Sequence, residues 1–408
     1  MTYKILSLDG GGPWALIQAC ALADLFPGAS GHQILGHFDL AIGNSGGSIT
    51  LAGLVKDLTP AEIRDLFLNS KNRSQIFRRT SLLGYFINKH LGIGPKWSTE
   101  DKLIGLTALL DADPAPRISA MKMSALPAIV KASTNRDIEI IVTAFEYDLN
   151  REIFFSAGQS VFSNLGTFEP TLAGAVHASS NAPVNYFNAP AVITSVNSGD
   201  DVHRFWDGGV GGYNNPVLQG VVEGISRGQS PNTIIALSIG TATVWRPLGI
   251  PTAGESQELF CKRADPSTLS DITKMAESIL DDPPDAASKN AHFATGAPNS
   301  PRIIRLNPVI GPSLSGASWA LPPGFSKFVD GSNPPNLLHE LDAFTALRDM
   351  PMDAVDQSDV ELIHQLAQLW IAGQISNQPI LRDLTTGASK IGYDTYNSAR
   401  QAAIDLGF

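Results

Sequence analysis

The sequence predicts an α/β fold in three layers, with a mostly parallel central sheet between helices. Two features of the N-terminal part predict this fold. An apolar strand at 5–8 runs into a glycine turn and then a helix, and a second apolar strand at 38–42 repeats the same plan. Two strand–loop–helix units within the first 55 residues are typical of a parallel sheet, because each helix carries the chain back to the same edge.

The first helix begins at Pro13, after Asp9-Gly10-Gly11-Gly12, and ends at Pro27-Gly28. Proline suits the first helical position, where an N–H would have no partner in the helix. The second helix covers 46–55. Gly and Pro interrupt the helical patterns of 60–132, which predicts a helical cap inserted into a first domain at 1–250.

The remaining elements follow from periodicity and from turn residues at their ends. Short apolar runs predict four further strands, at 138–145, 151–155, 203–206 and 233–239. Helices are predicted at 171–180 and 217–225, and amphipathic patterns predict two more at 337–348 and 359–372. Residues 251–408 are expected to form a mainly helical C-terminal extension packed on the first domain. The sequence Ser358-x-x-Glu361 predicts a capping box for the last of these helices.

Composition excludes several classes of protein. The chain has 408 residues and a net charge of −10, and 43% of its residues are hydrophobic against 17% charged. Such low charge argues against disorder and for a large buried core. An acidic chain is a poor ligand for a phosphate backbone, because nucleic-acid affinity depends on clustered Lys and Arg.

The compartment is inferred from cysteine use and from the absence of export signals. Cys20 and Cys261 are too few and too far apart for a disulfide framework or a zinc site, which favours a reducing compartment. The N-terminal apolar run is too short for a secretion signal, and glycines break the apolar stretch at 40–55 into a strand and a helix. We therefore expect a cytoplasmic protein, with peripheral membrane contact at most.

The first chemically informative turn is Gly43-Asn44-Ser45-Gly46-Gly47, a G-x-S-x-G sequence between an apolar strand and a helix. In that setting the motif forms a nucleophile elbow, a sharp turn that lifts the serine hydroxyl above the sheet. The alternative is a strand-to-helix turn in which Ser45 only caps the helix.

Two more turns carry chemistry at strand ends. Asp9-Gly10-Gly11-Gly12 leaves consecutive N–H groups at a helix N-terminus, where an anion or an oxyanion can bind. Neither nucleotide-binding signature is completed after it. Asp207-Gly208-Gly209 places a carboxylate beside residues without side chains, so Asp207 can act as a general base, although a turn aspartate is the alternative.

These three turns in this order resemble the patatin-like phospholipase family, whose pattern is D-G-G-G, G-x-S-x-G and D-G-G or D-G-A. Two further segments, 178–183 and 237–241, are similar to the family's flanking sequences. The resemblance is dense through about residue 240 and thins beyond it. It implies the patatin-like fold and a serine lipid acyl hydrolase.

The resemblance also implies the roles of the site residues. Ser45 would be the nucleophile and Asp207 the general base of a dyad. The family's oxyanion donors would be the amides of Gly10, Gly11 and Gly12, joined by that of Gly46. A dyad needs neither metal nor cofactor. The remaining motif residues are expected to shape the turns: Asp9, Gly43, Gly47, Gly208 and Gly209.

One position departs from the family pattern. The family continues D-G-G-G-x-R/K-G, whereas Trp14 and Ala15 stand at the basic and last glycine positions here. Backbone donors survive this change, but the lost positive side chain affects activity or substrate choice. The expected partners are a lipid or acyl ester substrate and a transient membrane or micelle surface. Apolar residues at 82–87 are candidates for an acyl-chain wall.

Other interpretations stay open at this stage. A Ser-His-Asp carboxylesterase shares the elbow and would need an essential histidine, with His177 and His203 nearest to the motifs. A non-catalytic lipid-binding protein could use the same cleft. An S-x-x-K sequence at Ser119–Lys122 suggests a penicillin-binding type of serine enzyme, but that family's other two motifs do not occur.

Overall fold

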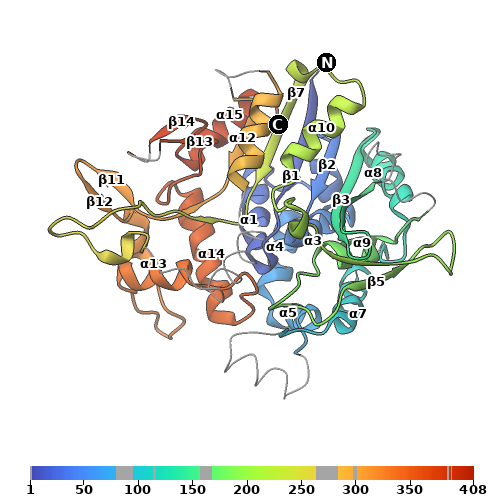
Figure 1. Cartoon of the computed structure of the whole chain (residues 1–408), viewed down its shortest axis with the longest axis horizontal. Helices are drawn as coiled ribbons and strands as arrows, with labels where there is room; N and C mark the ends of the chain where they lie inside the picture. The colour runs from blue at the N-terminus through green and yellow to red at the C-terminus, as the bar shows by residue number, and fades with distance from the viewer. Residues whose placement is uncertain are drawn as a thin grey trace.

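The computed structural model describes residues 2–79, 95–113, 116–156, 168–262, 284–296, 301–383, 386 and 388–408, so the segment 82–87 lies outside the described residues. An eight-stranded sheet forms the centre of the molecule, with helices on both faces (Figure 1). Its order is β5-β6-β3-β2-β1-β7-β9, and β4 also pairs with β3. Its strands are β1 (Tyr3–Leu8), β2 (Leu40–Gly43), β3 (Glu139–Glu146), β4 (Arg151–Ser156), β5 (Ala191–Thr194), β6 (Val202–Asp207), β7 (Ile234–Ile239) and β9 (Ile303–Leu306).

The sheet has a parallel centre and an antiparallel side. Strands β3, β2, β1, β7 and β9 are parallel to one another. Strands β4 and β6 run antiparallel to β3, and β5 runs antiparallel to β6. The predicted α/β fold with a mostly parallel sheet between helices is confirmed, and the sheet is mixed at the β3 side.

Helices cover the sheet and extend beyond it. They are α1 (Leu16–Leu25), α2 (Gly31–Leu35), α3 (Ser45–Val55), α4 (Pro60–Leu68), α5 (Ser70–Ile76), α7 (Thr99–Leu110), α8 (Leu126–Thr134), α9 (Leu172–Ser179), α10 (Val217–Ser226), α12 (Pro284–Ala294), α13 (Glu340–Arg348), α14 (Gln357–Ile371) and α15 (Tyr396–Asp405). Helices α4, α5, α7 and α8 lie in the chain between β2 and β3, where the sequence predicts a helical insertion.

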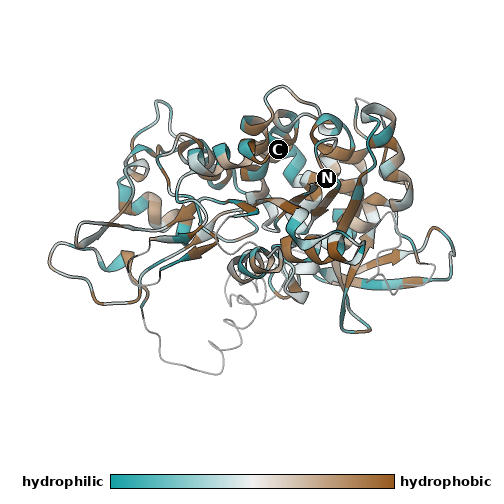
Figure 2. Cartoon of the chain, turned by 90° about the horizontal axis from the view of Figure 1, so that it is seen from above, coloured by the Kyte–Doolittle hydropathy of each residue, from teal (hydrophilic) through white to brown (hydrophobic). Residues whose placement is uncertain are grey.

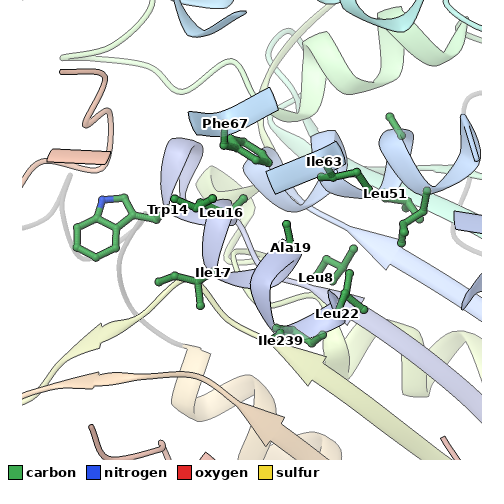
Figure 3. Packing of buried hydrophobic residues seen from close by; sticks show 14 of the residues in the cluster. Leu8, Trp14, Leu16, Ile17, Ala19, Leu22, Leu51, Ile63, Phe67 and Ile239 are labelled. Carbon is green, nitrogen blue, oxygen red and sulfur yellow. The ribbon is translucent and has the colours of Figure 1, made fainter. Parts of the chain in front are cut away.

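Both faces of the central strands are apolar, as expected for buried parallel strands. Successive side chains of a strand point to opposite faces. Ile5 and Leu40 belong to the hydrophobic cluster that includes residues of α10, whereas Leu6 and Leu8 belong to the larger cluster with α1 and α3. Figure 3 shows Leu8 of β1 beside Leu22 of α1 in this larger cluster.

The C-terminal part contributes to the sheet as well as to the helical layers. Strand β9 pairs with β7, and α14 packs against α1. Strands of this part also form three two-stranded pairings. β10 (Val309–Ile310) pairs with β8 (Thr243–Val244) of the first domain, β11 (Ser313–Ser315) with β12 (Ser318–Ala320), and β13 (Leu381–Arg382) with β14 (Ser389–Ile391). Residues after 250 therefore complete the sheet that carries the glycine turns.

The predicted capping box before the helix at 359–372 is wrong. Helix α14 begins at Gln357, and Asp356 occupies the N-cap position in an extended conformation. Ser358 therefore lies inside the first turn, where its backbone is already helical.

Apolar residues gather along the strands and the inner sides of the helices, with hydrophilic residues toward the outside (Figure 2). In the parts of the chain that the structure describes, no helix combines the length and the apolar character needed to cross a bilayer.

We predict that Gly47→Ala destabilises the protein. A Cβ atom at Gly47 would lie 2.3 Å from the carbonyl oxygen of Leu8 and 2.6 Å from that of Asp9, so α3 would have to move away from β1. Overpacking of this kind costs about 1–3 kcal/mol. Urea denaturation of the variant measures the change in unfolding free energy.

Gly199→Ala is the matched control, because a Cβ atom there would have no heavy atom within 4 Å. Equal unfolding free energies for the two variants would contradict the close approach of α3 to β1.

Candidate active site

The G-x-S-x-G turn forms a strained elbow between β2 and α3. Ser45 is the first residue of α3 and has a φ of 47°, in the left-handed region that non-glycine residues rarely adopt. A Cβ at Gly43 would lie 2.8 Å from the carbonyl oxygen of Gly47, and one at Gly46 would lie 2.5 Å from that of Gly12. The glycines therefore allow the elbow to close tightly and to touch the other glycine turn.

The pairing of β3 explains why Asp207 reaches this elbow. Strand β4 occupies one edge of β3 along 141–146, so β2 and β6 share the other edge. Gly43, the last residue of β2, lies opposite Val142, and Asp207, the last residue of β6, lies opposite Ala144. Because β2 and β6 run in opposite directions, their C-terminal ends meet on either side of Thr143.

A network of hydrogen bonds joins the two strand ends. The Asn44 amide donates to Asp207 Oδ1 at 3.1 Å, and the Thr143 hydroxyl donates to the Asn44 Oδ1 atom at 2.6 Å. The Gly209 N–H also donates to Asp207 Oδ1, at 2.8 Å. The backbone N–H of Ser45 donates to the Ser179 hydroxyl at 2.9 Å. The carboxylate is thus held on one oxygen, and the elbow is tied to α9.

Asp207 is 2% exposed, and its environment changes its acidity. Burial raises the pKa of this carboxyl above its usual value, because the charged form loses hydration. Hydrogen bonds from the Gly209 N–H, the Ser45 side chain and the Asn44 amide oppose the rise, as does the charge of Lys102. The result is a carboxylate more basic than an ordinary aspartate, close enough to the Ser45 side chain to be influenced by it.

Lys102 is a buried basic residue next to the same carboxylate. Its side chain on α7 is 0% exposed, donates to the Asn181 Oδ1 atom at 3.2 Å and lies 4.2 Å from the centre of the Phe187 ring. Burial lowers the pKa of Lys102 well below its usual value, and the attraction of Asp207 opposes that shift. Asn181 also accepts the Asp207 N–H through its carbonyl oxygen, so it contacts both charged residues.

The glycine turn lies directly beside the elbow. A Cβ atom at Gly10 would be 3.0 Å from Ser45 Cβ. Gly11 and Gly12 have φ values of 154° and 54°, which favour glycine. Within the described residues, the N–H groups of Gly11, Gly12 and Gly46 donate to no protein acceptor. They remain available for an oxyanion.

The Gly10 amide is not free, in contrast to the predicted oxyanion donor. Its N–H donates to the carbonyl oxygen of Asn214 at 2.8 Å, so this amide is not available to an oxyanion in the structure. Sequence alone does not reveal this bond, because Asn214 lies 204 positions further along the chain.

Ser45 lines one of two adjoining cavities. The first contains Ser45 and Lys102 in its wall, together with Phe187 and Met352. It shares four wall residues with a second, apolar cavity between α3, α4, α5 and α7: Gly12, Ile49, Ile76 and Phe77. Most of the other residues around the second cavity are apolar: Pro13, Ala52, Gly53, Leu58, Leu66, Phe67, Leu106, Leu109, Leu110 and Val176.

A more polar cavity lies on the other side of the glycine turn. Its wall includes Gly10 and Gly11, and Asn214, Thr241 and Thr243 bring polar side chains to it. It shares Tyr186 and Met352 with the cavity at Ser45. The site therefore has an apolar side and a polar side, with the elbow and the glycine turn between them.

Trp14, at the position of the family's basic residue, packs inward. It is 6% exposed, and its indole N–H donates to the carbonyl oxygen of Pro351 at 3.2 Å. Figure 3 shows its ring directed away from the residues around Leu8. The side chain thus joins the glycine turn to the segment before α14 and does not contribute a charge.

The histidines and the S-x-x-K sequence do not join this site. Among the described residues, no histidine hydrogen-bonds to Ser45 or Asp207; His203 contacts Glu146 and Asp201, and His177 is buried on α9. Burial and the nearby charge of Lys102 hold the pKa of His177 well below its usual value.

Ser119 and Lys122 have separate partners, Asp111 and Asn197, so the S-x-x-K residues do not pair with each other. The described residues also contain no group of three or more His, Cys, Asp or Glu side chains arranged to hold a metal ion.

Sequence reasoning missed three polar residues of the site. Asn44 stands inside the G-x-S-x-G motif, so its position was a signal, although the motif assigns it no role. Thr143 and Lys102 lie on β3 and α7 without any local motif. Only the packing of these elements places them beside Asp207.

The strained elbow leads to a prediction about stability that does not depend on activity. Replacing Ser45 by glycine removes the left-handed strain, which costs about 1–2 kcal/mol for a residue with a Cβ atom, whereas Ser45→Ala retains it. We expect Ser45→Gly to be more stable than Ser45→Ala by roughly 1 kcal/mol, after the greater chain entropy of unfolded glycine is counted. Chemical denaturation of the two variants measures the difference, and a more stable alanine variant would show that the elbow is not strained.

Comparison with known proteins places these features in a family. The model of the patatin-like phospholipases matches residues 6–221, which is more than half of the 408-residue chain. A cGAMP-activated phospholipase of Pseudomonas aeruginosa is 35% identical over 111 residues. That match covers 26% of this chain and only 32% of the relative's length.

Two solved structures show weaker likeness. VipD from Legionella pneumophila is 10% identical, with 90% of this chain and 67% of that chain covered and a TM-score of 0.33. ExoU of Pseudomonas aeruginosa, solved with SpcU, is 16% identical, with 44% and 38% covered and a TM-score of 0.22. Scores this low do not establish a shared fold, so the assignment depends on the match over 6–221: the chain belongs to the patatin-like phospholipase family.

Proposed function

We propose that the protein is a serine lipid acyl hydrolase of the phospholipase A or esterase type, with Ser45 as nucleophile and Asp207 as general base. The observation that carries the proposal is that the strand ends bring a buried, basic carboxylate next to a serine on a strained elbow, in the wall of an apolar cavity. The family membership of the chain supports the same class of reaction.

The first half of the reaction forms an acyl-enzyme. Asp207 takes the proton of the Ser45 hydroxyl while Oγ attacks the ester carbonyl carbon, and the carbonyl electron pair moves to the oxygen. The free amides of Gly11, Gly12 and Gly46 stabilise that oxyanion. When the tetrahedral intermediate collapses, the carbon–oxygen bond to the alcohol breaks and the alcohol takes the proton from Asp207.

The second half releases the acid. Water attacks the acyl-enzyme carbonyl and gives a proton to Asp207, and the second intermediate expels Ser45 Oγ, which recovers that proton. Oδ1 of Asp207 already accepts from Asn44 and Gly209, so Oδ2 is the oxygen that exchanges protons with Ser45. The Asn44 and Gly209 bonds hold the carboxylate in one orientation through both steps.

The two sides of the site match the two parts of an acyl ester. The apolar cavity between α3, α4, α5 and α7 suits the acyl chain, and the cavity with Asn214, Thr241 and Thr243 suits the alcohol part. The charged Lys56 and Arg73 also line the apolar cavity, but their side-chain nitrogens donate hydrogen bonds to backbone carbonyl oxygens. Because these groups are already paired, they do not disfavour an alkyl chain in the cavity.

Membrane contact is proposed to be transient. A net charge of −10 disfavours electrostatic docking on an anionic bilayer, so apolar groups around the cleft would make the contact. Activation by cGAMP is stated in the name of the relative from Pseudomonas aeruginosa. A match over 111 residues does not extend that property to this chain.

The proposal predicts that Ser45→Ala and Asp207→Asn each lower turnover of p-nitrophenyl acyl esters and of phospholipid vesicles by roughly 10³- to 10⁶-fold. Loss of the nucleophile or of its base stops acyl-enzyme formation, and a fluorophosphonate probe should label wild type but not Ser45→Ala. Ser119→Ala and Asp201→Asn are matched controls with expected wild-type turnover. Wild-type activity in both site variants would contradict the proposal.

The same turnover assay, applied to two histidine variants, distinguishes the alternatives. Complete loss of turnover in His177→Ala or His203→Ala, with Asp207→Asn active, would establish a Ser-His-Asp esterase. Lipid binding without turnover, and no labelling of Ser45, would establish a lipid-binding protein.

The raised pKa of Asp207 predicts a pH dependence. The base acts only when ionised, so kcat/KM should fall as the pH drops through a pKa that lies above the usual range for aspartate. The charge of Lys102 favours the ionised form of Asp207, so Lys102→Met should move this acid limb to higher pH. Lys131→Met, which removes an exposed ion pair with Asp137, is the control. An unchanged limb in Lys102→Met would show that Lys102 is uncharged at the working pH.

A further inference from the structure

The glycine turn is held by residues beyond the part of the chain that the family model matches. Asp9, which precedes the turn, is 2% exposed, and Arg305 on β9 is also 2% exposed. Arg305 Nη2 lies 2.6 Å from Asp9 Oδ2. These residues are 296 positions apart, and the family match ends at residue 221.

Arg305 is itself fixed on its other nitrogens. Its Nη1 donates to the Ser238 hydroxyl at 2.9 Å, and its Nε donates to Gln378 Oε1 at 3.3 Å. The same Gln378 oxygen accepts from the Asn307 amide at 2.6 Å. The guanidinium therefore joins the residue after β1, strand β7 and the segment around 378, and its planar fork has little freedom to move.

Asp9 and Gly10 are both anchored before the turn reaches the free amides. Its N–H donates to the carbonyl oxygen of Ile239 at 3.1 Å, and its carbonyl oxygen accepts from Gln18 at 2.8 Å. The next residue is also held, since Thr241 donates to the carbonyl oxygen of Gly10 at 2.6 Å. After Gly10 the chain turns, and Gly12 lies in the wall of the Ser45 cavity, where its nitrogen would be 2.9 Å from a Cβ atom at Gly46.

Among the described residues, Arg305 is the single side-chain partner of the Asp9 carboxylate, whose Oδ1 atom is buried without a hydrogen bond. Burial raises the pKa of Asp9 to about 6, and the charge and hydrogen bond of Arg305 oppose this rise. Within the described residues, Arg305 is the charged group that opposes the rise. The carboxylate at the base of the turn thus depends on Arg305 for its ionisation and its orientation.

We propose that Arg305 is a positioning residue for the oxyanion turn, and that its fork to Asp9, Ser238 and Gln378 sets the placement of the Gly11 and Gly12 amides. The inference depends on the proposed acyl hydrolase function. It makes the C-terminal part of the chain a structural component of the active site, since β9 supplies the residue that orients a turn at the N-terminus.

The test compares R305M, R305K and the control R302M in the full chain. Arg302 precedes the same strand but donates to the carbonyl oxygen of Asn232 and does not contact the turn. We expect R305M to lower kcat on the order of 10- to 100-fold and to change KM by less than about twofold. This loss in kcat should not exceed the loss caused by removing one oxyanion donor. R305K, which keeps the charge without the fork, should give an intermediate kcat, and R302M should match wild type.

The pH profile separates positioning from a general loss of structure. Under this proposal the acid limb of kcat/KM depends on the ionisation of Asp9 as well as on that of Asp207. Without Arg305 the pKa of Asp9 rises further, so the limb in R305M should move to higher pH, whereas R305K should keep the wild-type limb. D9N should lower kcat to a similar degree, and adding R305M to D9N should lower it no further. Far-ultraviolet circular dichroism and thermal denaturation confirm that each variant is folded at the assay temperature.

Wild-type kcat in R305M overturns the proposal, and so does wild-type kcat in R305K if R305M does not fold. Losses in D9N and R305M that multiply in the double variant would overturn it too, because Arg305 would then act independently of Asp9. The function is tested separately: active Ser45→Ala removes the proposed function, whereas inactive Ser45→Ala with fully active R305M removes only the role of Arg305.

Discussion

Strand β3 sets the geometry on which the rest of the site depends. One of its edges is shared end to end by β2 and β6, which run toward each other and stop at Gly43 and Asp207. Two segments that are more than 160 residues apart are thereby brought to the same point, with Thr143 between them. The antiparallel direction of β6 is essential, because a parallel strand in that position would carry its N-terminal end to the elbow.

Close backbone approach is the second constraint. The elbow and the D-G-G-G turn touch where Gly46 meets Gly12, and α3 lies against the end of β1 at Gly47. Side chains at these points would separate the serine from the free amides. The glycines thus serve a geometric purpose at the junction of two strand–turn–helix units.

Four of the buried charged residues of this low-charge protein lie around these turns. Asp9, Lys102, Asp207 and Arg305 are each at most 2% exposed, in a chain of which only 17% is charged. A buried charge is costly without a partner, so each acid here has a base nearby: Asp9 with Arg305, and Asp207 with Lys102. The position of Trp14, where the family has a basic residue, fits this pattern, since the positive side chains near the turns come from α7 and β9.

The sequence by itself determined the local features of this protein. Apolar runs at 5–8 and 38–42 specify strands, glycine-rich turns specify where these strands stop, and the motifs single out Ser45 and Asp207, because all of these signals lie within a few adjacent residues. The capping box predicted at Ser358 is wrong although it is a local feature, because Asp356 occupies the N-cap position. Only the tertiary structure decided that the Gly10 amide is occupied by Asn214, that Lys102 faces Asp207, and that Arg305 anchors Asp9. Each of these contacts joins residues roughly a hundred or more positions apart, and their proximity arises from strand order and helix packing, which no short stretch of sequence encodes.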